Sequence, residues 1–571
     1  MTSPGRQPAD ALQRATLTRA FLSRFFENEI TGGSNDLKTT YFWMIGFLAT
    51  PGFLIPIYMM WNWEVTARFQ GLHALRILAM PDKAVYLSLA LTATGLLTAI
   101  TWNSLLLDRR DALILGTLPV RAALVVRAKL LALAAYLGVL IGGMHGLASL
   151  TFGVLLASEN TFGFLLRGIA AHAFAAASSR VFVVLAVTAI QGTALALAGP
   201  RVFSRISPIL QALLIGSVLL GLTTLPALSD AVQQRFGETG PPPDIAWMAF
   251  TPAIWFLGSY EWALGSHDPM LVAMHWRGMM ALGVAGVLTL TSFPLAYRRL
   301  MSVAVEGDQA SMPRQTRWTL VEWLVPIAGA NPAARASAQF FFASIARVER
   351  LRFAIAAAIG LVAGWSLPSL AFLTSRATSH APTTALLALS LADLCFLIVG
   401  LRVAIALPAD VRSNWMTVVM DAPAPRLRSG VWRAMFAMAV VPFALICVPL
   451  CWWLWGPVVA GLHLLLLVAA GALLIELLLW KWAEMPCANL WRPDQAQLGK
   501  RWPLYMIAFL VFTAGLARIA MWLLETPVSF VVFIAILIGL TLVIRRSHNR
   551  QVRLPFEEPD VVGAPTVLNL Q

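Results

Sequence analysis

The chain has 571 residues, of which 58% are apolar and only 12% are charged. Soluble domains carry about 25% charged residues, so this composition excludes a water-soluble protein and predicts an all-α integral membrane protein. The net charge of +14 is spread over many loops, as expected for Lys and Arg that stay in the cytoplasm. No basic helix or RNA-binding motif accompanies it, so we expect no nucleic-acid partner.

The apolar runs define the predicted transmembrane helices. A bilayer core about 30 Å thick needs about 20 apolar residues per helix. Windows of that length predict about twelve transmembrane helices, and the Ala-rich stretch 168–178 either extends the fourth or lies at the membrane surface. The twelve cover residues 41–61, 84–106, 130–155, 181–199, 207–227, 277–297, 353–373, 384–407, 434–455, 458–480, 503–524 and 527–544.

The distribution of basic residues predicts the orientation. With both termini in the cytoplasm, the segments on the inner side carry 33 of the 42 Lys and Arg residues. Lys and Arg accumulate in cytoplasmic loops, and one missed span would reverse the side of every later loop. The distribution therefore supports twelve spans with both termini cytoplasmic.

Two inner loops share a pattern that indicates an internal repeat. Each has an Asp-x-Arg sequence, then a Pro, then a basic residue ten positions after the Pro. These residues are Asp108, Arg110, Pro119 and Lys129 in the first loop, and Asp410, Arg412, Pro423 and Arg433 in the second. Each loop follows the second span of its half and precedes the third.

The repeat extends to the segments before the first span of each half. Residues 11–30 and 335–352 both place Arg on one side of a helix and Phe or Leu on the other, as an interfacial helix would. We therefore predict two six-span halves, 1–310 and 311–571, with an amphipathic helix before each and a cytoplasmic tail at the end. The halves differ in the long outer segment 228–276, which only the first has.

The two inner loops suit docking to a soluble protein. A short amphipathic helix between two spans, stiffened by Pro and rich in Arg, is a rigid element that a partner can push. The alternative interpretation is an ordinary basic connection that follows the positive-inside rule. Besides the repeated residues, the candidate docking residues are Arg109, Asp111, Arg121, Arg127 and Arg426.

Motifs for catalysis or metal binding are not found. Gly499-Lys500 lacks the spacing of a phosphate-binding loop, so we expect no ATP binding by this chain, no catalytic residue and no cofactor. His145, His172 and His463 stand apart in the sequence and are interpreted as helix-packing residues. The four Cys include Cys447 and Cys451 on one helical face, but none has a zinc spacing. We interpret them as small buried residues and expect no metal site.

Charged residues inside spans are costly and therefore informative. Asp393 lies midway along the eighth span, Glu476 near the inner end of the tenth, and Arg518 in the outer part of the eleventh. We interpret Glu476 and Arg518 as structural, either paired or reaching the interface. Asp393 has two interpretations. It forms an ion pair with Arg518 or Arg402, or it lines a polar cavity.

The first inner loop also carries a resemblance to a known family. The segment DRRDALILGTLPVR from Asp108 to Arg121, followed by Arg127 and Lys129, resembles the loop between the second and third spans of ATP-binding cassette (ABC) permeases of the type-2 exporter class. That family has six spans per unit, an amphipathic cytoplasmic helix, and short outer helices before the sixth span, where residues 251–265 lie here. The second half departs from it, with Ala-Pro-Ala-Pro at 422–425.

The resemblance implies the membrane subunit of an ATP-driven exporter. A separate ABC ATPase would bind ATP and supply the energy, and the chain would be a multi-pass protein of the bacterial cytoplasmic membrane. The apolar spans favour a hydrophobic or lipid-like substrate. Two alternatives are a membrane-embedded enzyme of lipid or glycan metabolism, with its site in 228–276, and an ion-coupled carrier that uses Asp393.

Overall fold

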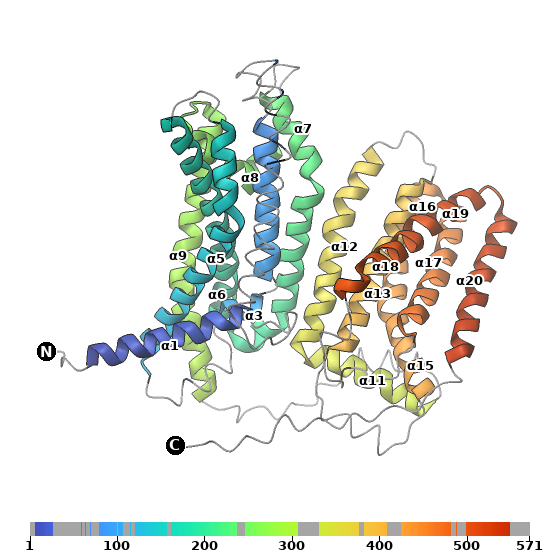
Figure 1. The fold of residues 1–571 in the computed structure, drawn as a ribbon. Helices are drawn as coiled ribbons and strands as arrows, with labels where there is room; N and C mark the ends of the chain where they lie inside the picture. The colour runs from blue at the N-terminus through green and yellow to red at the C-terminus, as the bar shows by residue number, and fades with distance from the viewer. Residues whose placement is uncertain are drawn as a thin grey trace. The chain divides into compact units, whose positions relative to one another are not determined.

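The computed structural model describes most of the chain as helices (Figure 1). Within the described residues, nearly every position is helical and none belongs to a strand. The described residues are 6–26, 79–99, 101–106, 120–156, 162–236, 246–305, 331–375, 382–407, 424–480 and 498–548, with single residues at 57, 59, 63, 65, 69, 115 and 487.

The described part of the chain contains nine helices that are long and apolar enough to cross a membrane. This composition, repeated over so many helices, indicates a multi-pass membrane protein. Of the predicted span 41–61 the structure describes only residues 57 and 59, and the predicted span 84–106 is helical over 79–99. The nine helices are Ala122–Gly146, Leu165–Thr223, Pro269–Met301, Leu351–Leu370, Thr384–Ala406, Pro425–Trp455, Pro457–Leu478, Leu504–Leu523 and Pro527–Ser547.

The chain divides into two compact units. Unit 1 comprises Met1–Leu210 and Ser217–Met312, and unit 2 comprises Gln211–Gly216 and Pro313–Gln571. The main division falls close to the predicted boundary between residues 310 and 311. That each unit repeats one plan of six spans stays a prediction.

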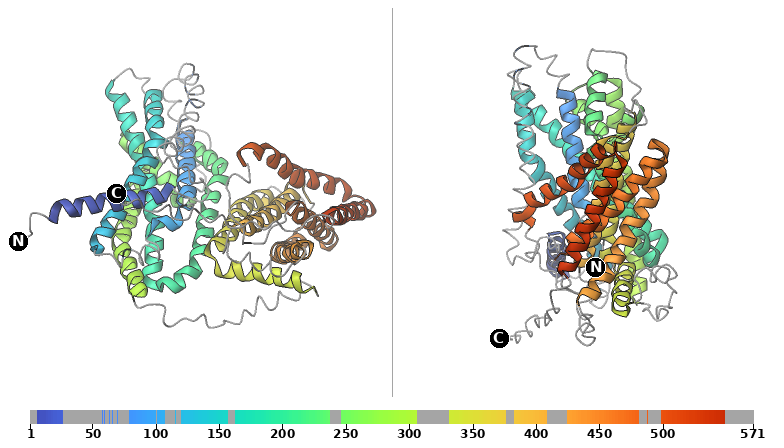
Figure 2. Two further views of the ribbon diagram at one scale, coloured as in Figure 1. Left: turned by 60° about the horizontal axis from the view of Figure 1, so that its bottom comes forward. Right: turned by 90° about the vertical axis from the view of Figure 1, so that its right-hand side faces the viewer.

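Unit 1 is a bundle of upright helices with one helix across its end. The views in Figures 1 and 2 show α1 running across the bundle, whereas α5, α6 and α9 run along it. The elements are α1 (Arg6–Phe26), the helix 79–99, α3 (Trp102–Leu105), α5 (Ala122–Leu156), α6 (Phe162–Thr223), α7 (Leu225–Phe236), η2 (Ala246–Phe250), α8 (Pro252–Ala263) and α9 (Pro269–Val305).

α6 joins two of the predicted spans and reverses direction between them. Gly199 has φ +78° and is followed by Pro200, which interrupts the helix. Both legs meet Trp102, which donates its indole N–H to Ser207 (2.9 Å) and accepts from Gln191 on its carbonyl (3.3 Å). The predicted break at 200–206 is therefore a sharp turn, and the Ala-rich stretch 168–178 belongs to the first leg.

α8 and α9 form a tight hairpin in unit 1. Gly258 allows the close approach, because a Cβ there would lie 2.8 Å from the backbone nitrogen of His275. Asp268 accepts hydrogen bonds from the amides of Met270 and Leu271 and thereby caps α9. Most residues of α8 are buried, so this segment, which the resemblance places among the short outer helices, is a core helix of unit 1.

Unit 2 is a second bundle, in which α13 packs against α12, α17 and α19. Asn331 caps α11 through its side-chain oxygen, which accepts from Ala333 N at 3.0 Å, and Pro332 occupies the first turn. The elements are α11 (Pro332–Arg347), α12 (Glu349–Ser375), α13 (Thr384–Ala406), α15 (Ala424–Met435), η5 (Phe436–Val440), α16 (Val441–Trp455), α17 (Pro457–Leu478), α18 (Leu498–Leu510), η7 (Val511–Gly515), α19 (Leu516–Leu523) and α20 (Pro527–His548).

In each unit the segments predicted to be cytoplasmic gather at one end. In unit 1 this end holds α1, α3, the start of α5 and the end of α9 (Figure 1). In unit 2 it holds α11, the start of α15 and the ends of α13, α17 and α20 (Figure 1). Arg402 at the end of α13 donates to the Leu478 carbonyl at the end of α17 (3.1 Å), which ties two of these ends together. We call this the inner end of each unit.

Candidate functional site

The predicted docking residues are only partly within the described residues. Arg121, Arg127 and Arg426 are exposed at the inner ends, Arg433 is half-buried, and Lys129 is buried. Arg121 precedes α5, and Arg127 and Lys129 follow in the first turns of that helix. The remaining candidates lie outside the described residues: Asp108, Arg109, Arg110, Asp111, Pro119, Asp410, Arg412 and Pro423.

In unit 1, α1 packs on the first half of α5. The Lys129 ammonium lies 4.9 Å from the ring centre of Phe21 and 5.0 Å from that of Phe25. Phe25 also stacks on Tyr136 of α5, with 4.7 Å between ring centres. A cation held over aromatic faces away from water contributes more than an exposed one. Lys129, predicted as a docking residue, instead lies beneath α1 and joins α1 to α5.

In unit 2, α11 packs on α15 in the same way. The hydroxyl of Ser337 donates to the carbonyl of Leu427 (2.9 Å). A Cβ on Gly430 would lie 3.0 Å from Cα of Ala334 and closer still to its carbonyl, so only glycine permits this approach. In both units, therefore, the helix before the first predicted span of the half is held against the helix that starts the third.

A basic pocket opens at the inner end of unit 2. Glu476 is buried there, 4.0 Å from a terminal guanidinium nitrogen of Arg428 and 3.7 Å from Nε of Arg545. The Arg545 guanidinium lies over the ring of Trp432 at 5.2 Å, and the indole N–H of Trp432 is buried without a partner. The cavity measures about 210 Å³ and is lined by Pro425, Arg426, Arg428, Ser429, Trp432, Glu476 and Arg545.

The three predicted intramembrane charges have different surroundings. Glu476 is buried and paired with Arg428 and Arg545. Asp393 is buried and accepts a hydrogen bond from the hydroxyl of Ser366. Arg518 lies on an exposed face of α19.

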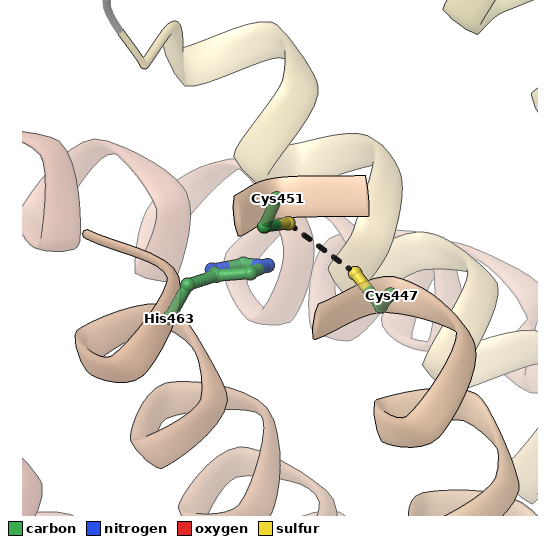
Figure 3. A group of neighbouring side chains, drawn as sticks. All are labelled: Cys447, Cys451 and His463. Atoms are coloured by element: carbon green, nitrogen blue, oxygen red, sulfur yellow. Dashed lines mark hydrogen bonds between the residues drawn. The ribbon is translucent and has the colours of Figure 1, made fainter. Parts of the chain in front are cut away.

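Two cysteines and a histidine meet inside unit 2 (Figure 3). The sulfur atoms of Cys447 and Cys451 on α16 are 3.6 Å apart. His463 comes from α17, and one potential ligand atom from each residue lies within 4.8 Å of the other two. Figure 3 shows the His463 ring reaching towards the two sulfurs. All three side chains are buried, so the group offers the sulfur and imidazole ligands of a thiophilic metal ion.

The surroundings of His463 fix its ring. Its Nε2 lies 2.9 Å from the hydroxyl of Ser390 on α13, and its Nδ1 is buried without a partner. Trp455 meets the ring edge to face, with 5.8 Å between centres. The sequence signal for this group was the hairpin: Cys451 and His463 stand five and seven residues from Gly456, on opposite sides of the turn between α16 and α17.

Unit 1 holds a buried ion pair that sequence reasoning missed. The Lys83 ammonium donates to Glu261 of α8 at 2.6 Å, and both side chains are less than a tenth exposed. The ammonium also lies 4.6 Å from the ring centre of Tyr260. Lys83 and Glu261 are 178 residues apart, so their pairing could not be read from local spacing.

A polar and aromatic cluster surrounds Tyr86 near this pair. Its hydroxyl lies 3.2 Å from Nδ1 of His145, whose ring centre is 6.0 Å from that of His172. The buried Arg180 donates to the carbonyl of Ala176 on its own helix (2.6 Å), and two of its nitrogens have no partner. The two histidines, which stand apart in the sequence, therefore share one buried cluster.

No known protein family, curated protein or solved structure matches the chain.

Proposed function

We propose that this chain is the membrane subunit of an ATP-driven exporter, powered by a separate ABC ATPase. In this proposal it crosses the bilayer twelve times, keeps both termini in the cytoplasm and carries no catalytic site of its own. The resemblance of residues 108–129 to type-2 exporter permeases suggests this class, and the nine apolar helices of the described residues agree with it.

The observation that carries the proposal is the paired packing at the inner ends. α1 is held on α5, and α11 is held on α15. α5 and α15 are the helices that begin directly after the two basic loops. A force applied to either pair would reach a transmembrane helix without passing through a flexible connection. Rocking of two such units about a midplane site is the general form of alternating access.

The basic pocket supplies a surface for the partner. Three arginines and one glutamate line it, so it has a net positive charge of two. Guanidinium groups bind carboxylates through two parallel hydrogen bonds, and an acidic side chain of the ATPase fits this chemistry. Arg426, at the exposed rim on α15, would make the first electrostatic contact.

The proposed cargo is a hydrophobic or lipid-like molecule. The outer surfaces of the described spans are apolar, with exposed Leu, Ile, Val and Trp side chains on both units. A cargo that partitions into the bilayer can approach such helices from the lipid phase.

The docking proposal is tested by charge reversal. The chain is co-expressed with an ABC ATPase from a neighbouring reading frame, and the captured ATPase and its stimulated hydrolysis are measured. Arg121→Glu with Arg426→Glu should leave insertion intact, because many other basic residues remain at the inner ends. A loss of about 2.7 kcal/mol at the interface would weaken capture about a hundredfold.

The matched control is Arg298→Glu with Arg546→Glu. These residues are exposed near the inner ends of α9 and α20 and lie on neither α5 nor α15. The control variant should capture the ATPase normally. Normal capture and hydrolysis in the Arg121/Arg426 variant, at equal membrane abundance, would refute docking by these loops.

A further inference from the structure

We propose that Cys447, Cys451 and His463 bind one thiophilic divalent metal ion, with Zn²⁺ as the physiological candidate, inside the α16–α17 hairpin. This site is independent of the proposed export function. The sequence alone predicts that the cysteines are small buried residues, and the structure adds a third ligand from the next helix.

The backbone places the three ligands without further rearrangement of the helices. Residues four apart lie on one face of a helix, so Cys447 and Cys451 direct both sulfurs to the same side of α16. Gly456 has φ +83° and turns the chain directly into α17, which begins at Pro457. The rise of about 1.5 Å per residue puts Cys451 and His463 at about the same depth below this turn.

The observed spacing fits tetrahedral zinc. Zn–S bonds of about 2.3 Å at a tetrahedral angle place two sulfurs about 3.8 Å apart. The sulfurs of Cys447 and Cys451 are 3.6 Å apart, and the imidazole ligand atom is within 4.8 Å of both. Shifts of about 1 Å, within reach of side-chain rotation, would complete the geometry.

Charge balance favours a divalent ion. The group is buried within predicted spans, where a net charge is strongly disfavoured. Binding of Zn²⁺ would release the two thiol protons to solution, and the resulting ion, two thiolates and a neutral imidazole sum to zero. A monovalent ion such as Cu⁺ would leave a net charge of −1.

The surroundings match those of a metal-binding histidine. Such a histidine is oriented by hydrogen bonds and neighbouring packing, which fix the ring before the metal arrives. Here Ser390 bonds one ring nitrogen and Trp455 packs edge to face against the ring. Three protein ligands leave a fourth coordination position for a further ligand.

The chain provides its own matched control for the test. It has four cysteines, all free and buried, and only two of them belong to the proposed site. Full-length protein is purified, its metal content is measured, and after chelation it is titrated with Zn²⁺ or with Co²⁺ as a spectroscopic probe. The wild type should take up one ion per chain, and Co²⁺ should give thiolate-to-cobalt charge-transfer absorption.

The variants separate the site from the other cysteines. Cys447→Ala with Cys451→Ala should abolish uptake and the charge-transfer absorption, whereas Cys395→Ala with Cys487→Ala should keep both. His463→Gln should weaken binding and keep thiolate absorption. Equal membrane abundance and elution volume show that each variant is folded.

Two results would overturn the proposal. Wild-type protein with less than one Zn²⁺ per chain and no cobalt absorption would show that the cysteines are ordinary buried residues. Stoichiometric binding of Cu⁺ without binding of Zn²⁺ or Co²⁺ would refute the assignment to a divalent ion.

Discussion

At the inner end of unit 1, α1 packs on the start of α5, and at the inner end of unit 2, α11 packs on the start of α15. The two contacts use different side chains for the same purpose. Lys129 lies over Phe21 and Phe25 in unit 1, whereas Ser337 and Gly430 allow close backbone approach in unit 2. The shared feature is therefore the arrangement of helices, which our docking proposal requires of both units.

Away from the inner ends the two units differ. Unit 1 has α7, η2 and α8 before its last long helix, and α8 contributes Glu261 to the buried pair with Lys83. In unit 2, α19 reaches α20 through a short turn, and the bundle instead holds the cysteine–histidine group. We interpret the inner ends as common to both units and the remaining parts as specialised.

The largest effect is expected in the part that only unit 1 has. Glu261→Gln should leave the buried Lys83 ammonium without its countercharge, and breaking a buried ion pair costs about 3–5 kcal/mol. Thermal unfolding of the purified protein should occur at lower temperature, and amide exchange in α8 should rise. Lys83→Met together with Glu261→Gln should recover much of the loss, because no charge then stays unpaired.

The control for this change is Asp230→Asn, an exposed acid on α7. It should leave the unfolding temperature unchanged. If Glu261→Gln is equally harmless, the ion pair does not hold α8 in unit 1, and the contrast between the units loses its main energetic support.

A smaller effect is expected at the contact common to both units. Gly430→Ala should force α11 away from α15, and such overpacking costs about 1–3 kcal/mol. Amide exchange of residues 332–347 should increase, while exchange of α1 in unit 1 stays the same. Gly461→Ala is the control, since a Cβ there meets nothing within 4 Å. Unchanged exchange in α11 would contradict the glycine-dependent contact.

Hydropathy predicted the elements better than their partners. Each predicted span that falls within the described residues lies on a helix. Arg201 and Arg205 lie just after Gly199, where the chain turns between two of these spans. Lateral contacts between helices depend on how small and polar side chains of two helices pack together. A hydropathy window covers one segment and carries no information about its partner. Glu476 shows this, because its arginine partners come from α15 and α20.

The candidate sites show the same limit. Arg121 and Arg426 could be selected from the sequence because loop charge is a local property. The burial of Lys129 could not be predicted from the sequence, because it depends on the packing of α1 over α5. The meeting of His463 with Cys447 and Cys451 was accessible in principle, since Gly456 predicts a turn and a turn pairs residues at similar distances from it.

The central proposal is that both inner ends face the cytoplasm and dock a separate ATPase. Reporter fusions along the chain test it most directly. Fusions after residues 120, 310, 420 and 560 should report the cytoplasm, and those after 60, 230 and 456 should report the outside, because Lys and Arg concentrate on the inner side. A cytoplasmic signal after 230, or opposite sides for 120 and 420, would contradict the account.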